Sequence, residues 1–133
     1  MNIEFVVSAI IPALPEEIYQ VWLSSEGHSA MAGSPASISA IVGNEFNAWD
    51  GYIHGKNLER VPGIRIVQSW RTSEFSADEP DSRVEITLES AGKQTRLTLK
   101  HTVLPPSGWQ YEQGWIESYF EPMQKYFTGR RDA

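Results

Sequence analysis

The segment from Ser107 to Gly129 constrains the fold of this chain more than any other. At about 100° per residue, the angular step of an α-helix, its apolar side chains gather in one stripe opposite an arc of Gln, Glu and Lys. We therefore predict one amphipathic helix of roughly 30 Å, whose strongly aromatic face needs a broad, concave partner. The stripe consists of Trp109, Ile116, Phe120, Met123 and Phe127, and Trp115, Tyr119 and Tyr126 widen it.

The sequence also carries signals for the ends and the interior of this helix. Ser107, with Gln110 three positions later, fits a capping box, and Gly129 fits a C-terminal stop. Pro122 lies inside the helix and cannot donate to the carbonyl of Ser118, so we predict a kink or a local widening there. Two readings remain open: the bend keeps the helix wrapped to its partner, or it admits a ligand at one end.

The N-terminal part of the chain changes from a strand pattern to a helix pattern. Residues alternate between apolar and polar at first, and Pro12 then ends the alternation. Pro15 suits the first turn of a helix, because proline has no N–H to leave unsatisfied there. The elements predicted here are a strand from Ile3 to about Ile11, a helix starting near Pro15 and a short helix from Glu26 to Met31.

From residue 36 the apolar residues recur with a period of about two, which is typical of antiparallel strands. Asp50-Gly51, between Trp49 and Tyr52, is the strongest hairpin signal of the chain. Residues 73–82 are rich in Ser, Asp and Glu and are expected to form an exposed loop. The predicted strands are 37–41, 46–49, 52–60, 64–71, 83–90 and 95–103.

These elements predict an α+β fold with one domain, residues 1–133. Six or seven antiparallel strands form a curved sheet wrapped around the long C-terminal helix, and two short helices follow the first strand. A curved sheet around one helix leaves space between them wherever side chains do not fill it. The glycines at 51, 55 and 63 are expected at sharp bends or close backbone approaches.

Composition excludes several classes of function. The chain has no cysteine, which rules out disulfides, a thiolate nucleophile and a cysteine-ligated metal. Its net charge of −6 argues against nucleic acid as a partner, and Arg130-Arg131, the one adjacent basic pair, fits a frayed helix end. We see no signal segment and no membrane span, so a cytoplasmic location is expected.

Several motifs in order resemble the Hsp90-ATPase-activator-like family of the START-like (SRPBCC) helix-grip superfamily. The resemblance implies a helix-grip fold. It also implies either a ligand cavity, as in the carriers, hormone receptors and polyketide cyclases of the superfamily, or a chaperone partner. The motifs are Tyr19, Trp22, Gly27-His28, Met31 to Pro35, Gly43 to Phe46, Trp49 to Ile53, Gly55, Pro62-Gly63, Ile66 to Arg71, His101 and Phe120 to Pro122.

The three histidines are far apart, and none belongs to a known metal-binding spacing. His54 lies in a polar strand and is expected at the surface, and we expect His28 to be in solvent. His101 shares a strand face with Leu97 and Leu99. It is either a hydrogen-bonded core histidine or a pocket-lining group that orients a polar ligand atom.

Aromatic and polar residues on matching faces indicate a cavity between sheet and helix. Core filling is the alternative for the aromatic residues. Gln68 stands between Ile66 and Trp70 on one strand face, and a buried amide needs a partner, which a ligand, water or a backbone group can supply. The predicted lining consists of Trp49, Gln68, Trp70, His101, Trp115, Tyr119 and Met123, with no cofactor and no metal.

The sequence therefore predicts a domain that binds a small apolar or amphipathic molecule. One alternative is a protein that contacts an Hsp90-type chaperone through its outer face. Another is a cyclase or hydrolase acting on a hydrophobic substrate, in which His101 titrates inside the cavity. We find no nucleophile with a base at a known spacing, and Asp50 is explained by its turn, so no catalytic residue is predicted. The oligomeric state is left open.

Overall fold

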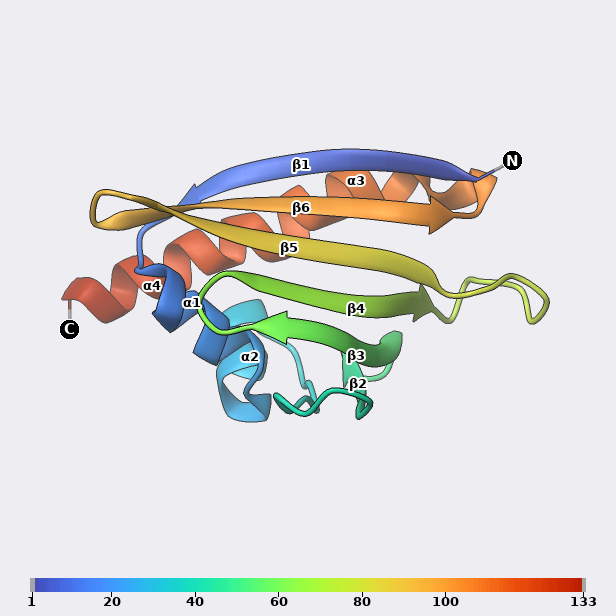
Figure 1. The fold of residues 1–133 in the computed structure, drawn as a ribbon, viewed down its shortest axis with the longest axis horizontal. Coiled ribbons are helices and arrows are strands. Elements are labelled where there is room, and N and C mark those ends of the chain that lie inside the picture. The colour runs from blue at the N-terminus through green and yellow to red at the C-terminus, as the bar shows by residue number, and fades with distance from the viewer. Residues whose placement is uncertain (1, 133) are drawn as a thin grey trace.

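The structure is a computed structural model that describes residues 2–132, with side chains from 2 to 129. The side chains of Arg130 and Arg131 therefore lie outside the described residues. The fold is α+β, as predicted: one curved antiparallel sheet has its helices on one face (Figure 1). The elements are β1 Ile3–Ile11, α1 Pro15–Trp22, α2 Ser25–Ala32, β2 Glu45–Ala48, β3 Ile53–Val61, β4 Arg65–Thr72, β5 Ser82–Ala91, β6 Gln94–Leu104, the 3₁₀ turn η1 Pro106–Trp109, α3 Gln110–Trp115, the π-helical turn η2 Ile116–Phe120 and α4 Glu121–Asp132.

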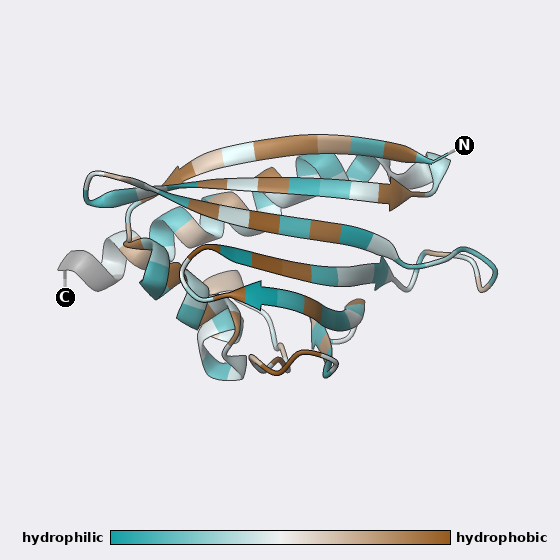
Figure 2. Cartoon of the chain, viewed as in Figure 1, coloured by the Kyte–Doolittle hydropathy of each residue, from teal (hydrophilic) through white to brown (hydrophobic). Residues whose placement is uncertain are grey.

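The sheet has the strand order β1-β6-β5-β4-β3-β2, so β1 and β2 form its edges. Hydrophobic and hydrophilic residues alternate along the strands (Figure 2), which directs one face of each strand into the core. Val7, Leu99, Ile86 and Ile66 are partners in register across β1, β6, β5 and β4, and all four are buried. This row holds the middle of the sheet to the helices.

The C-terminal helix runs from Pro106 to Asp132 in four segments of three helical geometries: η1 is 3₁₀, α3 and α4 are α, and η2 is π. It lies behind β1, β6 and β5 in the view of Figure 1 and contacts β1 along most of its length. The predicted local widening is confirmed, because η2 contains Ser118 and ends two residues before Pro122. A π turn is wider than an α turn, and the α-helical bonds between residues i and i−4 are already interrupted in it. Proline, which has no N–H, therefore disrupts no hydrogen bond there.

The wide turn changes which residues of this helix are buried. Tyr111, Trp115, Tyr119, Met123 and Phe127 recur at intervals of four and are all buried. In a straight α-helix such a series drifts by about 40° at each step, and the wider η2 turn reduces that drift. Trp115 and Tyr119, which we placed at the side of the stripe, therefore belong to the buried series with Met123 and Phe127, and Tyr111, which we did not assign to it, extends the series.

Three predictions for this helix are wrong, two at its N-terminus and one at its C-terminus. Trp109 is 55% exposed, because it lies in the tight η1 turn rather than on the buried stripe. Ser107 makes no capping box: Pro106 opens η1 with its φ already fixed, and no side chain caps the turn. Gly129 does not stop the helix, which continues to Asp132.

The segment 37–41 does not form the seventh strand that its alternation predicts. Ser37 makes a single bridge to β2, and the rest of the segment is irregular. Side chains satisfy its backbone instead: Ser25 Oγ accepts from Ile38 N at 2.9 Å and donates to Ile38 O at 3.0 Å. Asn57 donates to two further carbonyls of this segment at 2.7 and 3.2 Å. Because these side chains satisfy backbone N–H and C=O groups of the segment, it does not need to pair as a strand in the sheet.

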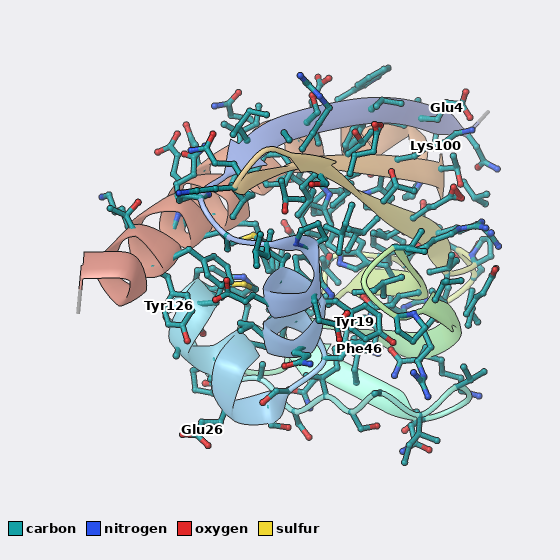
Figure 3. All side chains as sticks on the ribbon, turned by 60° about the vertical axis from the view of Figure 1, so that its left-hand side comes forward. Glu4, Tyr19, Glu26, Phe46, Lys100 and Tyr126 are labelled. Carbon is teal, nitrogen blue, oxygen red and sulfur yellow. The ribbon has the colours of Figure 1, made fainter. Side chains whose placement is uncertain are left out.

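The core fills the space between the sheet and the helices. Tyr19 on α1 and Phe46 on β2 are 5% and 6% exposed and lie in the interior (Figure 3). The charged side chains of Glu4, Glu26 and Lys100 lie on the outside of the molecule in the same view. Pro15 stands in the first turn of α1, as predicted.

Candidate functional site

A pocket of about 350 Å³ opens between the turn that joins β2 to β3, strand β4 and the C-terminal helix. Its volume lies within the range of small-molecule sites. The turn supplies one wall, β4 the floor, and α3 with η2 the opposite wall. The lining consists of Trp49, Tyr52, Ile53, Trp70, Gln110, Tyr111, Gly114, Trp115, Ser118 and Tyr119.

The β2–β3 turn places Trp49 at this pocket. Asp50 and Gly51 have φ angles of 55° and 88°, and Tyr52 N donates to Trp49 O at 3.1 Å, which together define the predicted hairpin turn. Trp49 itself has a φ of 53°, a left-handed conformation that is unfavourable for a bulky residue. A hydrogen bond of 2.9 Å from Asp50 N to Pro35 O holds the turn against the loop after α2. The tertiary contact therefore offsets local strain beside the pocket.

The aromatic side chains of the lining contact one another in an unbroken series. The ring centroids of Trp49 and Tyr119 are 6.4 Å apart, and those of Tyr119 and Trp115 are 4.9 Å apart. Trp115 and Trp70 follow at 5.6 Å, and Trp70 meets Tyr111 edge-on at 4.9 Å. We call these five residues the aromatic wall. Their mutual contacts fix the ring positions, so the pocket is largely preformed.

Directly behind the aromatic wall lies His101, fully buried on β6. The indole N–H of Trp115 donates to His101 Nδ1 at 3.0 Å, so Nδ1 is unprotonated and Nε2 carries the hydrogen. His101 Nε2 then donates to Ser82 Oγ at 2.8 Å, and Ser82 Oγ donates to the carbonyl of Trp70 at 2.6 Å. Burial lowers the pKa of His101 to about 3, which keeps the imidazole neutral. Of the two alternatives given for His101, a core histidine or a pocket-lining group, the structure thus supports the hydrogen-bonded core histidine.

Ser82 and His101 are the residue types of a nucleophile and its base, but the hydrogen bond between them runs in the wrong direction for catalysis. A base must accept the serine proton on an unprotonated ring nitrogen, whereas the ring nitrogen facing Ser82 is the one that carries hydrogen. Ser82 is 2% exposed and its hydroxyl hydrogen is already committed to Trp70. The arrangement therefore orients Trp115 and Trp70 rather than activating a serine.

A second buried histidine supports the other end of the aromatic wall. The prediction that His28 lies in solvent is wrong, since it is 2% exposed. Its Nδ1 lies 2.8 Å from the carbonyl of Trp22, which can only accept, so Nδ1 carries the hydrogen and Nε2 accepts from Tyr119 Oη at 2.8 Å. Burial lowers the pKa of His28, against the smaller opposing effect of its bond to Trp22. Sequence placed it on a short helix with a weak apolar pattern, which hid its burial.

Gln68 finds its partners inside the protein. Its Oε1 accepts from the indole N–H of Trp22 at 3.4 Å, and its Nε2 donates to Asn57 Oδ1 at 2.9 Å. Through Asn57 this chain of bonds reaches the irregular segment 37–41. The amide thus joins α1, β4 and β3 and is 2% exposed. Ligand and water are not needed to satisfy it.

The structure brings together four of the seven residues predicted for the lining. Trp49, Trp70, Trp115 and Tyr119 border the pocket. Gln68, His101 and Met123 do not: each is buried behind it, the first two in the hydrogen-bond networks above and Met123 in the packed core. The reason is that a strand or helix face is wider than the pocket mouth, so sharing a face does not guarantee access.

Six lining residues escaped the sequence reasoning: Tyr52, Ile53, Gln110, Tyr111, Gly114 and Ser118. The sequence does contain a pattern that could have predicted most of the lining residues on the helix. Gln110, Gly114 and Ser118 recur at intervals of four beside the buried series that begins at Tyr111. Small residues in such a row leave room on a helix face. A Cβ added at Gly114 would meet no atom within 4 Å, so the missing side chain is part of the opening.

The pocket is uncharged at its lining, which contains no Asp, Glu, Lys, Arg or His. Burial raises the pKa of Tyr119, and burial followed by a hydrogen bond to Glu74 raises the pKa of Tyr52, so both phenols keep their protons. Among the described residues no group of three His, Asp or Glu side chains is placed to hold a metal. Within the same residues no helix combines the length and hydropathy needed to cross a bilayer.

A second hollow, of about 510 Å³, lies on strands β2, β3 and β4 and is polar. His54 borders it and is exposed, as predicted. Lys56 and Arg71 contribute positive charge, and Glu45 and Asp81 contribute negative charge. Arg71 is held by Asp81 at 3.0 Å and by two loop carbonyls at the same distance. This mixture of charges is typical of a solvated surface or of a protein contact.

A curved antiparallel sheet around a long C-terminal helix, with two short helices after the first strand, defines the class of protein by its fold, which is the helix-grip fold of START-like (SRPBCC) type. Solved structures of this shape include an HSP90 activator from Plasmodium falciparum, with a TM-score of 0.80 and 20% identity over 89% of this chain and 91% of that one. The solution structure of the Aha1 dimer from Colwellia psychrerythraea has a TM-score of 0.69 and 18% identity, covering 87% and 88% of the two chains.

The family follows from the sequence comparison. Residues 12–128 match the family model for Activator of Hsp90 ATPase homolog 1-like protein, and the chain belongs to this family. It is 29% identical over 114 residues to the human activator of 90 kDa heat shock protein ATPase homolog 1, covering 85% of this chain and 33% of that protein. A Dictyostelium discoideum homolog is 28% identical over 116 residues, covering 86% and 30%. The chain thus spans about a third of the length of these relatives.

Proposed function

We propose that this domain binds a small apolar or amphipathic molecule in the pocket beside the aromatic wall. The observation that carries the proposal is a hollow of about 350 Å³ in a region otherwise packed with aromatic side chains. An opening lined by five contacting aromatic residues and by Gly114 is the kind of site that a ligand fills.

Ligand burial at this site is expected to be favourable. Each square ångström of apolar surface removed from water contributes about 25 cal/mol, and the aromatic wall provides a preformed apolar surface. The rings are held by two neutral histidines, His101 through Trp115 and His28 through Tyr119. Little conformational entropy is therefore lost when the site is occupied.

Native mass spectrometry of the protein purified from its own host tests this proposal. A retained small molecule is expected in the wild type and not in Gly114→Leu, which adds a bulky side chain at a lining position with open space around it. Gly114→Ala is the matched control, because its Cβ meets no atom within 4 Å and leaves most of the volume free. A wild-type spectrum of bare protein, together with no thermal shift from any member of an apolar compound set, would falsify the proposal.

A second candidate function is contact with an Hsp90-type chaperone. It is favoured by the curated relatives, which are named as activators of the Hsp90 ATPase. The polar hollow on β2–β4 offers a surface for such a contact, with exposed side chains of both charges. Since this chain covers about a third of those relatives, their activity is only proposed here. The expected cytoplasmic location fits both functions and stays a prediction.

Pull-down with Hsp90 and measurement of its ATPase rate test the second candidate. We expect binding at micromolar concentrations, weakened by Lys56→Glu in the polar hollow. Lys93→Glu, in the exposed β5–β6 turn, is the control with the same charge change. Absence of binding, or equal weakening by both substitutions, counts against a contact at this hollow. Ligand binding in the aromatic pocket is independent of either result.

A further inference from the structure

The lining of the aromatic pocket restricts the charge of what it can hold. Six of its ten residues are Trp or Tyr, and none carries a formal charge. An anion entering it would lose its hydration and find no Lys, Arg or protonated His in exchange. Burying an unpaired anion in such a site costs several kcal/mol or more, on the order of the whole binding energy of a small ligand, and the negative ring faces offset none of this cost. Carboxylates, phosphates and sulfonates are therefore poor ligands.

The hydrogen-bond directions sharpen this restriction. Tyr119 donates its hydroxyl hydrogen to His28, and Trp115 donates its indole hydrogen to His101. Tyr52, at the rim, donates to the carboxylate of Glu74. Three donors of the lining are thus directed away from the pocket. Their ring faces remain to interact with a ligand, whereas the phenol oxygens have neighbours in the protein: Trp49 hydrogen-bonds to Tyr119, and Thr72 and Tyr111 hydrogen-bond to Tyr52.

The faces of the six Trp and Tyr rings in the lining carry negative partial charge. A cation within about 6 Å of a Trp or Tyr centroid is attracted to the ring quadrupole, and the attraction strengthens when both groups are desolvated. The net charge of −6, and Glu74 next to the rim, add a field that favours approach of positive charge.

We propose that the pocket holds an organic cation: an alkylammonium group carried on an apolar body, with the charge against the aromatic wall. The inference rests on the proposed ligand-binding function and specifies its ligand class. Aromatic side chains from three separate parts of the fold converge here, namely the β2–β3 turn, strand β4 and the C-terminal helix. Such convergence surrounds a compact cation on several sides, which a single aromatic face does not.

Three probes of nearly equal shape separate charge from size. Benzyltrimethylammonium is the cation, neopentylbenzene is its uncharged isostere, and benzylsulfonate is the anion. Titration followed by tryptophan fluorescence is sensitive here, because Trp49, Trp70 and Trp115 border the pocket. We expect the cation to bind about ten-fold more tightly than neopentylbenzene, as expected for several ring contacts. Benzylsulfonate is expected to cause no saturable change.

Variants locate the binding. Gly114→Leu is expected to abolish binding of the cation, and Gly114→Ala to preserve it within about three-fold. Trp49→Leu keeps an apolar side chain at the half-buried turn but removes one ring. It is expected to weaken the cation about five-fold and to leave neopentylbenzene nearly unchanged. Circular dichroism of each variant confirms that the domain is folded.

The outcomes distinguish this inference from the proposed function. If neopentylbenzene binds as tightly as the cation, and Gly114→Leu abolishes both, the cation preference is wrong and the apolar-ligand proposal stands. If benzylsulfonate binds best, the charge argument is overturned. If the cation binds Gly114→Leu as well as wild type, its site lies elsewhere and the inference fails. If no probe binds and no molecule is retained by the native protein, both proposals fail.

Discussion

Replacing Gly55 by alanine is expected to destabilise the domain through a backbone clash. Gly55 lies in β3, and a Cβ built there would be 1.9 Å from the carbonyl oxygen of Ser69 and 2.6 Å from its carbonyl carbon. Contacts under 3.0 Å essentially do not occur for real Cβ atoms, so β3 and β4 must separate by at least about 1 Å. Backbone atoms of a paired strand cannot rotate away as the end of a side chain can.

The cost follows from the hydrogen bonds that such a shift breaks. The bond from Lys56 N to Ser69 Oγ is 2.9 Å long, and a further 1 Å takes it beyond hydrogen-bond range. Losing it and about two neighbouring ladder bonds, at about 0.5–1.5 kcal/mol each, destabilises by about 2–4 kcal/mol. Alanine restricts the unfolded chain and returns about 0.4–1 kcal/mol. The net loss of about 1–3.5 kcal/mol corresponds to a melting temperature lowered by about 3–13 °C.

Urea denaturation and thermal melting measure this loss, with Gly114→Ala as the matched control. Gly114 lies in α3, and an added Cβ meets no atom within 4 Å. The same substitution is therefore expected to stabilise the domain there, by about 0.5–1 kcal/mol, because alanine favours helix over glycine. If Gly55→Ala melts at or above the wild-type temperature, the close approach of β3 to β4 is wrong.

Two further predictions concern the buried polar groups. Lowering the pH from 7 to 5 is expected to reduce the free energy of unfolding by about 2 kcal/mol through His101 alone, with His28 adding in the same direction. The folded pKa of His101 is about 3 against an ordinary histidine pKa of 6.5, so below pH 6.5 the unfolded chain takes up a proton that the fold excludes. Urea midpoints at pH 7, 6 and 5 measure the effect, His54→Gln should retain it, and a pH-independent midpoint contradicts it. Asn57→Ala is expected to destabilise by about 2–4 kcal/mol, because it removes the partner of Gln68 and of two carbonyls; urea denaturation showing a loss below about 0.5 kcal/mol refutes this.

Local pattern was sufficient for the main elements of this fold. The two-residue period of the strands, the Asp50-Gly51 hairpin and the long aromatic helix depend on neighbours in sequence, and the structure confirms them. The seventh strand failed because the backbone of 37–41 is satisfied by Ser25 and Asn57. Neither residue is near that segment in sequence, so no local pattern records the competition.

The lining of the candidate site was likewise predicted only in part. Sequence identified Trp49, Trp70, Trp115 and Tyr119 because aromatic residues on inward faces can be read from periodicity. It did not identify Gly114, because an absent side chain becomes an opening only when the opposite wall is known.

What the sequence by itself determined is the arrangement of elements and the aromatic character of their buried faces. Only the tertiary structure decided that His28 and His101 are buried and neutral, each with one fixed tautomer. A histidine's tautomer depends on which donor or acceptor faces each ring nitrogen, and those partners come from other elements of the chain. These hydrogen bonds also direct the polar atoms of Trp115 and Tyr119 away from the pocket, and they form only after the helix is packed on the sheet.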